Sequence, residues 1–150
     1  MKSIVNSQLT GKWYKHTRDS HSHELNFVEI FIYLSHKVNG QRSVNNNHLD
    51  LLYVGVKDDR SSILRNISLR IMFENGFNYI IVRKFLLCKK FKVLLFDEIN
   101  GILILSGNRM KNISIYSRKY KLQLVMIEDY LKKIELEDPI KIILEEYYIV

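Results

Sequence analysis

The sequence predicts an all-β fold: an eight-stranded up-and-down antiparallel β-barrel, followed by one α-helix and a short final strand. Two observations predict it. From the N-terminus, stretches rich in β-branched and aromatic residues follow one another, with short turn-like segments between them. A helical hydrophobic period begins only after residue 120. Short connections favour a barrel, which has no exposed edge, over a two-sheet sandwich, which needs some longer crossing connections.

The strands are recognised by their composition and by their alternation. Apolar and polar residues alternate most cleanly in "ILRNISLRIMF", so this strand is expected to have one wet face. The "ENG" that follows it is a tight-turn signal, and the Asn-rich segment 38–48 suits a looser turn. Besides a short strand around Trp13, the predicted strands are 26–36, 48–57, 63–73, 77–85, 91–97, 101–106 and 112–117.

The hydrophobic period changes near the C-terminus. Between Leu124 and Ile134, apolar residues recur at steps of three and four, which places them on one stripe of a helix. Pro139 ends this pattern, so we expect a helix over about residues 121–136. The last run, "IKIILEEYYIV", is expected to be a short final strand.

Composition indicates a single globular domain over residues 1–150. A chain of this length can bury one hydrophobic core but is too short to suggest two. Its formal charge of +7 favours anionic ligands, nucleic acid or acidic membranes without selecting among them. Cys88 is the only cysteine, so no internal disulfide is expected. We expect a cytoplasmic protein if the chain is native from Met1, and a periplasmic or secreted one if a signal peptide was removed.

Two motifs resemble the lipocalin family. Gly11-Lys12-Trp13-Tyr14 is similar to the G-x-W signature that opens the first lipocalin strand. "ISIYSRKYKL" resembles the end of the eighth strand, where the family's arginine matches Arg118. Residues 91–118 are similar to the sixth-to-eighth-strand segment of bacterial lipocalins, and Asp97 matches the aspartate of a turn there. The resemblance covers nearly the whole chain in order.

The resemblance implies a closed end and an open end. It implies that Trp13 plugs the closed end and that Arg118 stacks on it, a contact worth about 1–2 kcal/mol when shielded from water. Fatty-acid-binding proteins have a similar start, but two helices separate their first two strands. Here only "DSHSHELN" intervenes, which favours a lipocalin. Many lipocalins have a signal peptide and a disulfide, and this chain shows neither.

The implied function is to bind one small hydrophobic or amphipathic ligand, such as a fatty acid or lysolipid, inside the barrel and without chemistry. Strand alternation predicts which residues line the cavity, although a slip of one residue reverses a strand's faces. The predicted cavity residues are Leu69, Ile71, Phe73, Tyr79, Phe91, Val93, Leu95 and Tyr116.

The open end is expected to be basic. In up-and-down topology alternate loops lie at the same end, and the loops opposite Trp13 are rich in cations. The predicted basic rim comprises Arg18, Lys57, Arg60, Lys89, Lys90, Arg109 and Lys111. A rim of this charge favours a ligand with a negative or strongly polar head. Ordinary solvated loop charges are the alternative interpretation.

Two other function classes stay open: a basic nucleic-acid-binding module, supported by charge alone, and a small isomerase or cyclase inside the same barrel. No catalytic residue, cofactor or metal site is predicted. His21 and His23 supply only two metal ligands where three or four are needed. Cys88 is interpreted as a bystander thiol because no partner base is recognisable. Contact with a membrane surface and the oligomeric state are left open.

Overall fold

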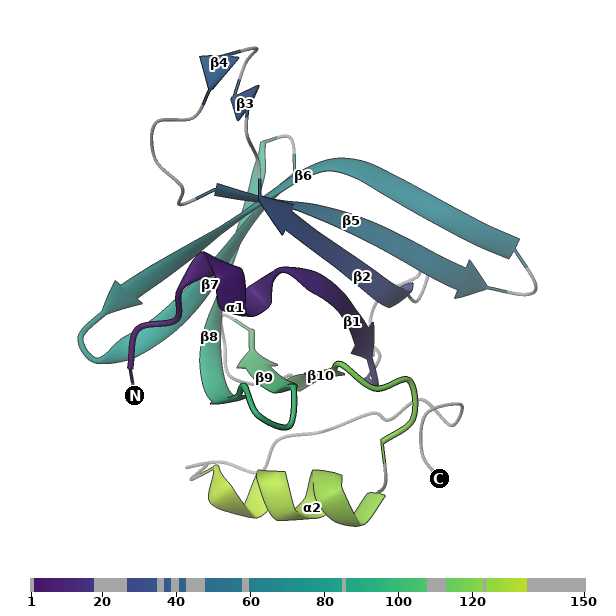
Figure 1. Ribbon diagram of the computed structural model, residues 1–150, viewed down its shortest axis with the longest axis vertical. Coiled ribbons are helices and arrows are strands. Elements are labelled where there is room, and N and C mark those ends of the chain that lie inside the picture. Colours follow the sequence, from purple (N-terminus) through teal and green to yellow (C-terminus); the bar gives the residue numbers. More distant parts are fainter. Residues whose placement is uncertain are drawn as a thin grey trace.

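Two helices and ten strands make up the part of the chain that the structure, a computed structural model, describes (Figure 1). That part comprises residues 2–17, 27–34, 37–38, 41–42, 48–57, 60–84, 86–107, 113–122 and 124–134. In chain order the elements are α1 (Asn6–Leu9), β1 (Gly11–Lys15), β2 (Phe27–Leu34), β3 (Lys37–Val38), β4 (Gln41–Arg42), β5 (His48–Lys57), β6 (Arg60–Glu74), β7 (Phe77–Lys84), β8 (Leu87–Asp97), β9 (Ile102–Ser106), β10 (Ile113–Ser117) and α2 (Leu124–Lys133). Neither helix is long and apolar enough to cross a membrane.

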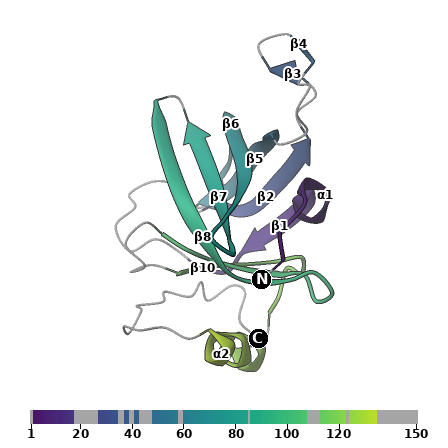
Figure 2. The same cartoon turned by 90° about the vertical axis from the view of Figure 1, so that its left-hand side faces the viewer.

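The main sheet is antiparallel throughout and strongly curled (Figure 2). Its strands are hydrogen bonded in the order β1, β10, β9, β8, β7, β6, β5, β2, and β1 also pairs with β2. β3 and β4 form a separate two-stranded ladder. The predicted antiparallel β fold with a helix near the C-terminus is therefore confirmed.

Several element bounds differ from those expected. β8 begins at Leu87, four residues earlier than expected, and β6 begins at Arg60 rather than at residue 63. The ladder of β3 and β4 was not expected from the Asn-rich segment. The helix α2 is shorter than predicted, and the expected final strand at 140–150 lies outside the described residues.

The turn between β6 and β7 follows directly from its sequence. Asn75 and Gly76 have φ angles of 52° and 81°. Two-residue hairpin turns that match the twist of antiparallel strands need positive φ at both positions, and Asn-Gly is their preferred sequence. The predicted tight turn thus lies where "ENG" indicated it.

Apolar side chains form two separate clusters on the two faces of the sheet. The interior cluster lies on the concave face and includes Trp13, Leu69, Ile80 and Val93. The outer cluster packs β9 and β10 against Ile127 and its neighbours in α2. All five residues of β9 are buried, because its alternate residues belong to different clusters. This explains why "ILILS" is a nearly continuous apolar run rather than an alternating one.

A polar contact fixes α2 to the turn between β8 and β9. Tyr130 donates a hydrogen bond from Oη to Oδ2 of Asp97 at 3.0 Å. The same carboxylate accepts two bonds from Asn100, from its backbone N at 3.1 Å and from Nδ2 at 2.8 Å. These bonds, the one from the Asn100 side chain foremost, lower the pKa of Asp97. Burial and the contact with Asp97 raise the pKa of Tyr130.

His16 is buried on the outer side of the sheet, just after β1. Its side chain is 0% exposed, and Nε2 lies 2.5 Å from Oγ of Ser117. Ser117 donates its own hydroxyl proton to the carbonyl of Lys119 at 2.7 Å, so Nε2–H of the neutral imidazole donates to Ser117. Burial lowers the pKa of His16 from 6.5 to about 4, and a hydrogen bond with the Lys119 backbone opposes this shift. His16 is therefore neutral at physiological pH.

The buried imidazole makes stability depend on pH. In the unfolded chain the pKa of His16 returns to about 6.5, so between pH 6.5 and about 4 the unfolded state binds the extra proton more readily. The free energy of unfolding should fall as the pH falls through this window, by up to about 3 kcal/mol. Urea unfolding at a series of pH values should show this slope in the wild type and a flatter one in His16→Gln. Equal slopes in the two proteins would contradict the assignment.

Candidate functional site

The N-terminal segment crosses one end of the curled sheet. The side chain of Asn78, at the start of β7, is 0% exposed and accepts a hydrogen bond from the backbone N of Ile4 at 2.8 Å. Its Nδ2 donates to the carbonyl of Lys2 at 2.7 Å. Leu9, in α1, is fully buried in the interior cluster together with Ile4. This segment thus forms the closed end from which the site is built.

Trp13 and Arg118 are brought together at this closed end. The indole is 1% exposed, and the guanidinium carbon lies 3.8 Å from the ring centroid. Trp13 donates from Nε1 to the carbonyl of Leu9 at 2.9 Å. Arg118 donates from Nη1 to the carbonyl of Lys12 at 2.9 Å and from Nη2 to that of Gln8 at 3.0 Å. The contact that the family resemblance implies is therefore present, with two backbone hydrogen bonds that the sequence could not indicate.

Two glycines make room for the arginine. A Cβ at Gly101, whose φ is +67°, would lie 2.5 Å from Cγ of Arg118. A Cβ at Gly11, whose φ is +107°, would lie 3.0 Å from Nη1 of the same side chain. The backbone N of Arg118 also donates to the carbonyl of Gly101 at 2.9 Å. Gly101 is thus a residue of the closed end that sequence reasoning missed, because the predicted strand 101–106 includes it as an ordinary strand residue, whereas β9 begins at Ile102.

Burial disfavours the charge on Arg118, and its contacts offset that cost. Burial lowers the pKa of Arg118 from its ordinary value. Guanidinium groups nevertheless stay protonated in proteins. The two carbonyl oxygens and the negative face of the indole supply the electrostatic compensation that water would otherwise provide.

The residues predicted to line a cavity do not all face inward. Leu69 and Val93 are buried in the interior cluster, and Ile71, Phe91 and Tyr116 pack against it. These five occupy the concave face of the sheet, where the alternation of β6, β8 and β10 predicted them.

The inward placement of Tyr79 and Leu95 is wrong. Ile80 belongs to the interior cluster, so alternation directs Tyr79 to the outer face of β7. Leu95 packs in the outer cluster because β8 has an irregularity between Val93 and Leu95. One residue, Leu94, is inserted there, and it reverses the alternation.

Phe73 lies at the end of β6, beside the β6–β7 turn, and is 46% exposed. It shares the inward face of β6 with Ile71 but lies beyond the interior cluster. It is therefore an exposed residue of the hairpin rather than part of a cavity wall.

Two residues of the predicted basic rim, Lys89 and Lys90, lie on opposite faces of β8. Lys89 is the register partner of Val82, which packs against the interior cluster, so Lys89 lies on the inward face of β8. Lys90 lies on the outer face, with Nζ 3.7 Å from Oε2 of Glu74 and 4.3 Å from the ring centroid of Tyr79. The expectation that Lys89 and Lys90 belong to one loop is therefore wrong, because β8 begins at Leu87.

The remaining predicted rim residues are described only in part. Lys57 and Arg60 are register partners at the end of the β5–β6 hairpin. Three others, Arg18, Arg109 and Lys111, lie outside the described residues, as do His21 and His23.

A second inward lysine was missed by sequence reasoning. Lys15 is the register partner of Tyr116, which packs against the interior cluster, and it follows Trp13 by two residues. Its half-buried side chain therefore shares the inward face of β1 with the indole. The period-two pattern starting from Trp13 could have identified it. Lys15 and Lys89 thus place two cations on the inward face beyond the apolar interior.

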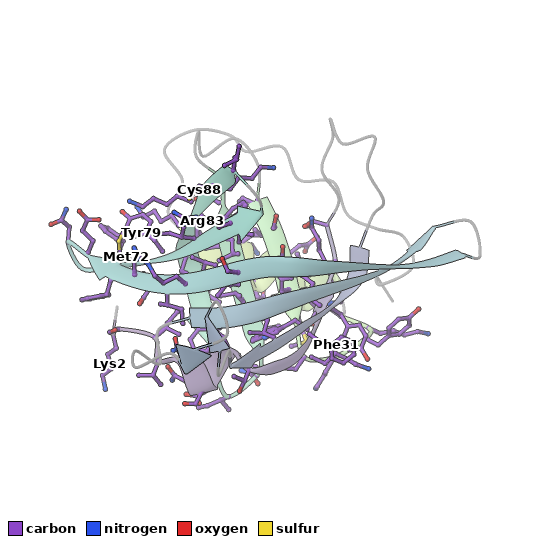
Figure 3. The ribbon with its side chains drawn as sticks, turned by 90° about the horizontal axis from the view of Figure 1, so that it is seen from above. Lys2, Phe31, Met72, Tyr79, Arg83 and Cys88 are labelled. Carbon is purple, nitrogen blue, oxygen red and sulfur yellow. The ribbon has the colours of Figure 1, made fainter. Side chains whose placement is uncertain are left out.

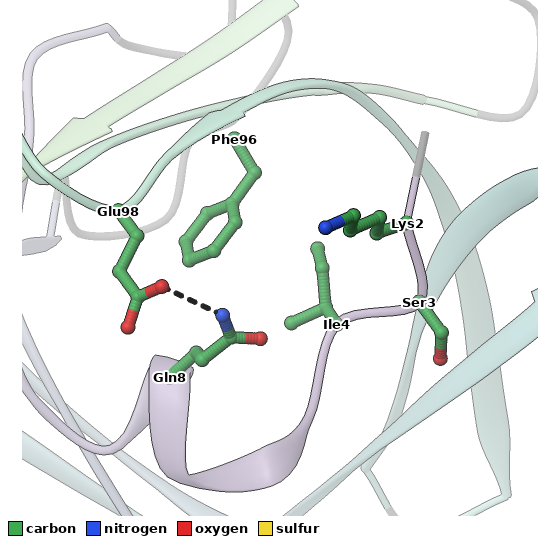
Figure 4. Close-up of a pocket in the computed structure, with 6 residues that line it drawn as sticks. All are labelled: Lys2, Ser3, Ile4, Gln8, Phe96 and Glu98. Atoms are coloured by element: carbon green, nitrogen blue, oxygen red, sulfur yellow. Dashed lines mark hydrogen bonds between the residues drawn. The ribbon is translucent and has the colours of Figure 1, made fainter.

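A small pocket lies at the closed end, between the N-terminal segment and β8 (Figure 4). Its volume is about 210 Å³, below the roughly 300–1,000 Å³ of pockets for drug-sized ligands. Gln8 donates from Nε2 to Oε2 of Glu98 across it at 2.8 Å. The lining residues are Lys2, Ser3, Ile4, Gln8, Phe96 and Glu98. The lining contains the cation Lys2, the carboxylate Glu98 and the amide of Gln8, which already donates to Glu98. The pocket is therefore a polar crevice rather than the expected apolar cavity.

Among the described side chains, a metal site or a catalytic nucleophile would be evidence of chemistry. These side chains contain no group of three or more His, Cys, Asp or Glu residues that could hold a metal ion. His16 and Ser117 are in contact, but both are fully buried on the outer side of the sheet and the hydroxyl proton is donated to a backbone carbonyl. A nucleophile needs access to substrate, so this pair is structural. Cys88 is exposed.

Replacing Arg118 should loosen the closed end. Arg118→Met removes two charged hydrogen bonds and the ring contact, and should lower the free energy of unfolding by about 2–4 kcal/mol. Because Trp13 is the only tryptophan, its emission reports this site directly and should shift to longer wavelength. Lys119→Met, which removes the same charge from an exposed neighbour, is the matched control. If both variants lower the free energy of unfolding and shift the Trp13 emission equally, the closed end does not depend on the guanidinium.

The glycine at position 101 gives a separate test. Gly101→Ala places a methyl group against Arg118, whereas a Cβ at Gly76, whose φ is +81°, meets nothing within 4 Å. Gly76→Ala should cost about 1 kcal/mol for its backbone conformation alone. Gly101→Ala should cost about 1–3 kcal/mol more, because the arginine has to move. Denaturant unfolding of the two variants measures the difference, and equal losses would refute the close approach.

Comparison with known proteins leaves the family of the chain open. No family model matches the sequence, and no curated protein matches it. The geometry of the closed end and of the inward face is therefore the basis on which a function is proposed.

Proposed function

We propose that the chain is an eight-stranded up-and-down barrel of the lipocalin type that carries one small amphipathic anion in its interior. A fatty acid or a lysolipid has the required chemistry. The observation that carries the proposal is the change along the inward face, from apolar residues near Trp13 to lysines toward the other end.

The barrel is supported by the order of the strands. β1 pairs with β10 on one side and with β2 on the other, so the sheet returns to its first strand. Closing a sheet in this way removes its edges, and eight strands leave room for one small ligand. The contact between Trp13 and Arg118 blocks one end, so that a ligand would enter at the other.

The ligand class follows from the two kinds of inward residue. The interior cluster and the rings of Phe91 and Tyr116 would take an alkyl chain by the hydrophobic effect. Lys15 and Lys89 share these inward faces, and their positive charge attracts an anionic head group. A molecule with an apolar chain and a carboxylate or phosphate head satisfies both. Binding alone is proposed, since no described group on this face is arranged for proton transfer.

Binding measurements on variants of the adjacent residues Lys89 and Lys90 test this function. A long-chain fatty acid should bind about tenfold more tightly than its methyl ester, because only the acid presents a charge to the lysines. Lys89→Glu should weaken binding of the acid by about tenfold. Lys90→Glu changes the net charge equally but lies on the outer face, and should leave the affinity within about twofold. Displacement of a fluorescent fatty acid measures all three.

The outcomes separate the alternatives. Equal affinity for acid and ester would indicate a neutral hydrophobic carrier and refute the anionic ligand. Equal effects of Lys89→Glu and Lys90→Glu would refute the inward role of Lys89. If neither acid nor ester binds, the carrier function itself is wrong.

A further inference from the structure

The outer face of β6, β7 and β8 carries a dense group of cations. Alternation directs it outward, because Leu69, Ile80 and Val93 on the same strands belong to the interior cluster. We name this surface the basic face and define it by the cations Arg70, Arg83, Lys90 and Lys92 with Met72, Phe77, Tyr79 and Ile81. Figure 3 shows Met72, Tyr79 and Arg83 on one side of the sheet, with Phe31 far from them. Helix α2 packs on β9, β10 and the far end of β8, at Leu94 and Leu95.

The charges of the basic face are largely unbalanced. Glu74, at the end of β6, is the one carboxylate among the described outward residues of β6, β7 and residues 87–93 of β8, and it lies 3.7 Å from Nζ of Lys90. Arg70 and Arg83 are exposed. Three cations therefore remain on this face after the pairing with Glu74, which gives it a positive potential.

Aromatic residues flank the turn at the end of this face. Phe73 and Phe77 stand on either side of the Asn75-Gly76 turn and are 46% and 43% exposed. Nζ of Lys92 lies 3.8 Å from the ring centroid of Phe77. The β6–β7 hairpin thus ends in two exposed phenyl rings with cations immediately behind them.

We infer that the basic face docks on the surface of an anionic lipid bilayer. The rings of Phe73 and Phe77 enter the boundary between headgroups and acyl chains, where aromatic residues are favoured. The cations behind them meet lipid phosphates. This inference does not depend on the proposed carrier function. Its cations and Phe77 lie on the outer face of the strands, and Phe73, although on the inward face of β6, lies beyond the interior cluster at the tip of the hairpin.

The same chemistry fits a single-stranded nucleic acid less well. Such strands bind by stacking their bases on free aromatic faces. Here lysine ammonium groups already lie over the rings of Tyr79 and Phe77, at 4.3 and 3.8 Å from the centroids. A membrane surface fits better. Its acyl-chain boundary can take the exposed rings at the tip of the hairpin, and its anionic headgroups can meet the cations behind them.

Sedimentation of the protein with vesicles tests the inference. Vesicles of phosphatidylcholine with about 30% phosphatidylglycerol should bind the protein, and pure phosphatidylcholine should bind it much more weakly. Arg70→Gln with Lys92→Gln should lower the partition coefficient by about 25-fold, from about fivefold for each cation near the surface. Phe77→Ser should lower it by about tenfold. Circular dichroism and the urea midpoint establish that each variant is folded.

Two matched controls locate the effect. Lys121→Gln with Lys132→Gln removes the same charge from exposed positions at and before α2, and Leu86→Ser removes an apolar side chain that is fully exposed in the β7–β8 turn. Both should bind within about twofold of the wild type. Losses equal to those of the basic-face variants would mean that net charge or general hydrophobicity drives binding, which overturns the inference. It is also overturned if anionic vesicles do not bind, or if a mixed-sequence single-stranded RNA binds instead and depends on Arg70 and Lys92.

Discussion

The contact between Arg118 and Trp13 joins parts of the chain that are distant in sequence. One guanidinium packs on the indole and donates to the carbonyls of Gln8 and Lys12, while the backbone of the same residue bonds to Gly101. The N-terminal segment, β1, β10 and the turn before β9 therefore meet at a single side chain. Shielding by these groups makes each interaction stronger than it would be in water, and it also makes the loss of any one partner costly. The closed end is consequently a cooperative unit.

The turn after β8 is the second point at which distant segments converge. Asp97 accepts a bond from Tyr130 of α2, and the adjacent Glu98 accepts one from Gln8 of α1. Helix α2 and the N-terminal segment are thus fixed from opposite sides of one short turn. Among the described residues, α2 packs on β9, β10 and Leu94 and Leu95 of β8, whereas the outward residues of β6, β7 and the first half of β8 include exposed cations. These cations belong to the basic face.

The sequence pattern predicted the strands and the helix, and the family resemblance implied the Trp13–Arg118 contact, but neither could fix the direction of every side chain. In "FNYIIVRKF" apolar residues occupy both faces, so the sequence does not show which alternate residues face inward. In the structure the inward face of β7 is that of Asn78, Ile80 and Val82, and Asn78 is buried because the N-terminal segment binds it. Leu95 faces outward because of a one-residue irregularity that leaves no signature in "FKVLLFD". His16 lies in a strongly basic stretch that gives no sign of burial. These features arise from contacts between segments that are distant in sequence.

Strand β8 shows how one segment can serve two surfaces. Lys89 and Phe91 share its inward face, while Lys90 and Lys92 point outward and lie over the rings of β7. Adjacent residues of like charge thus belong to different environments, and a sequence-based view of them as one basic loop merges two distinct electrostatic sites. Because a β-strand alternates with a period of two, substitutions one residue apart can perturb the interior and the outer wall independently. The proposed ligand site and the proposed membrane surface are therefore separable on a single strand, although both draw on the same excess of positive charge.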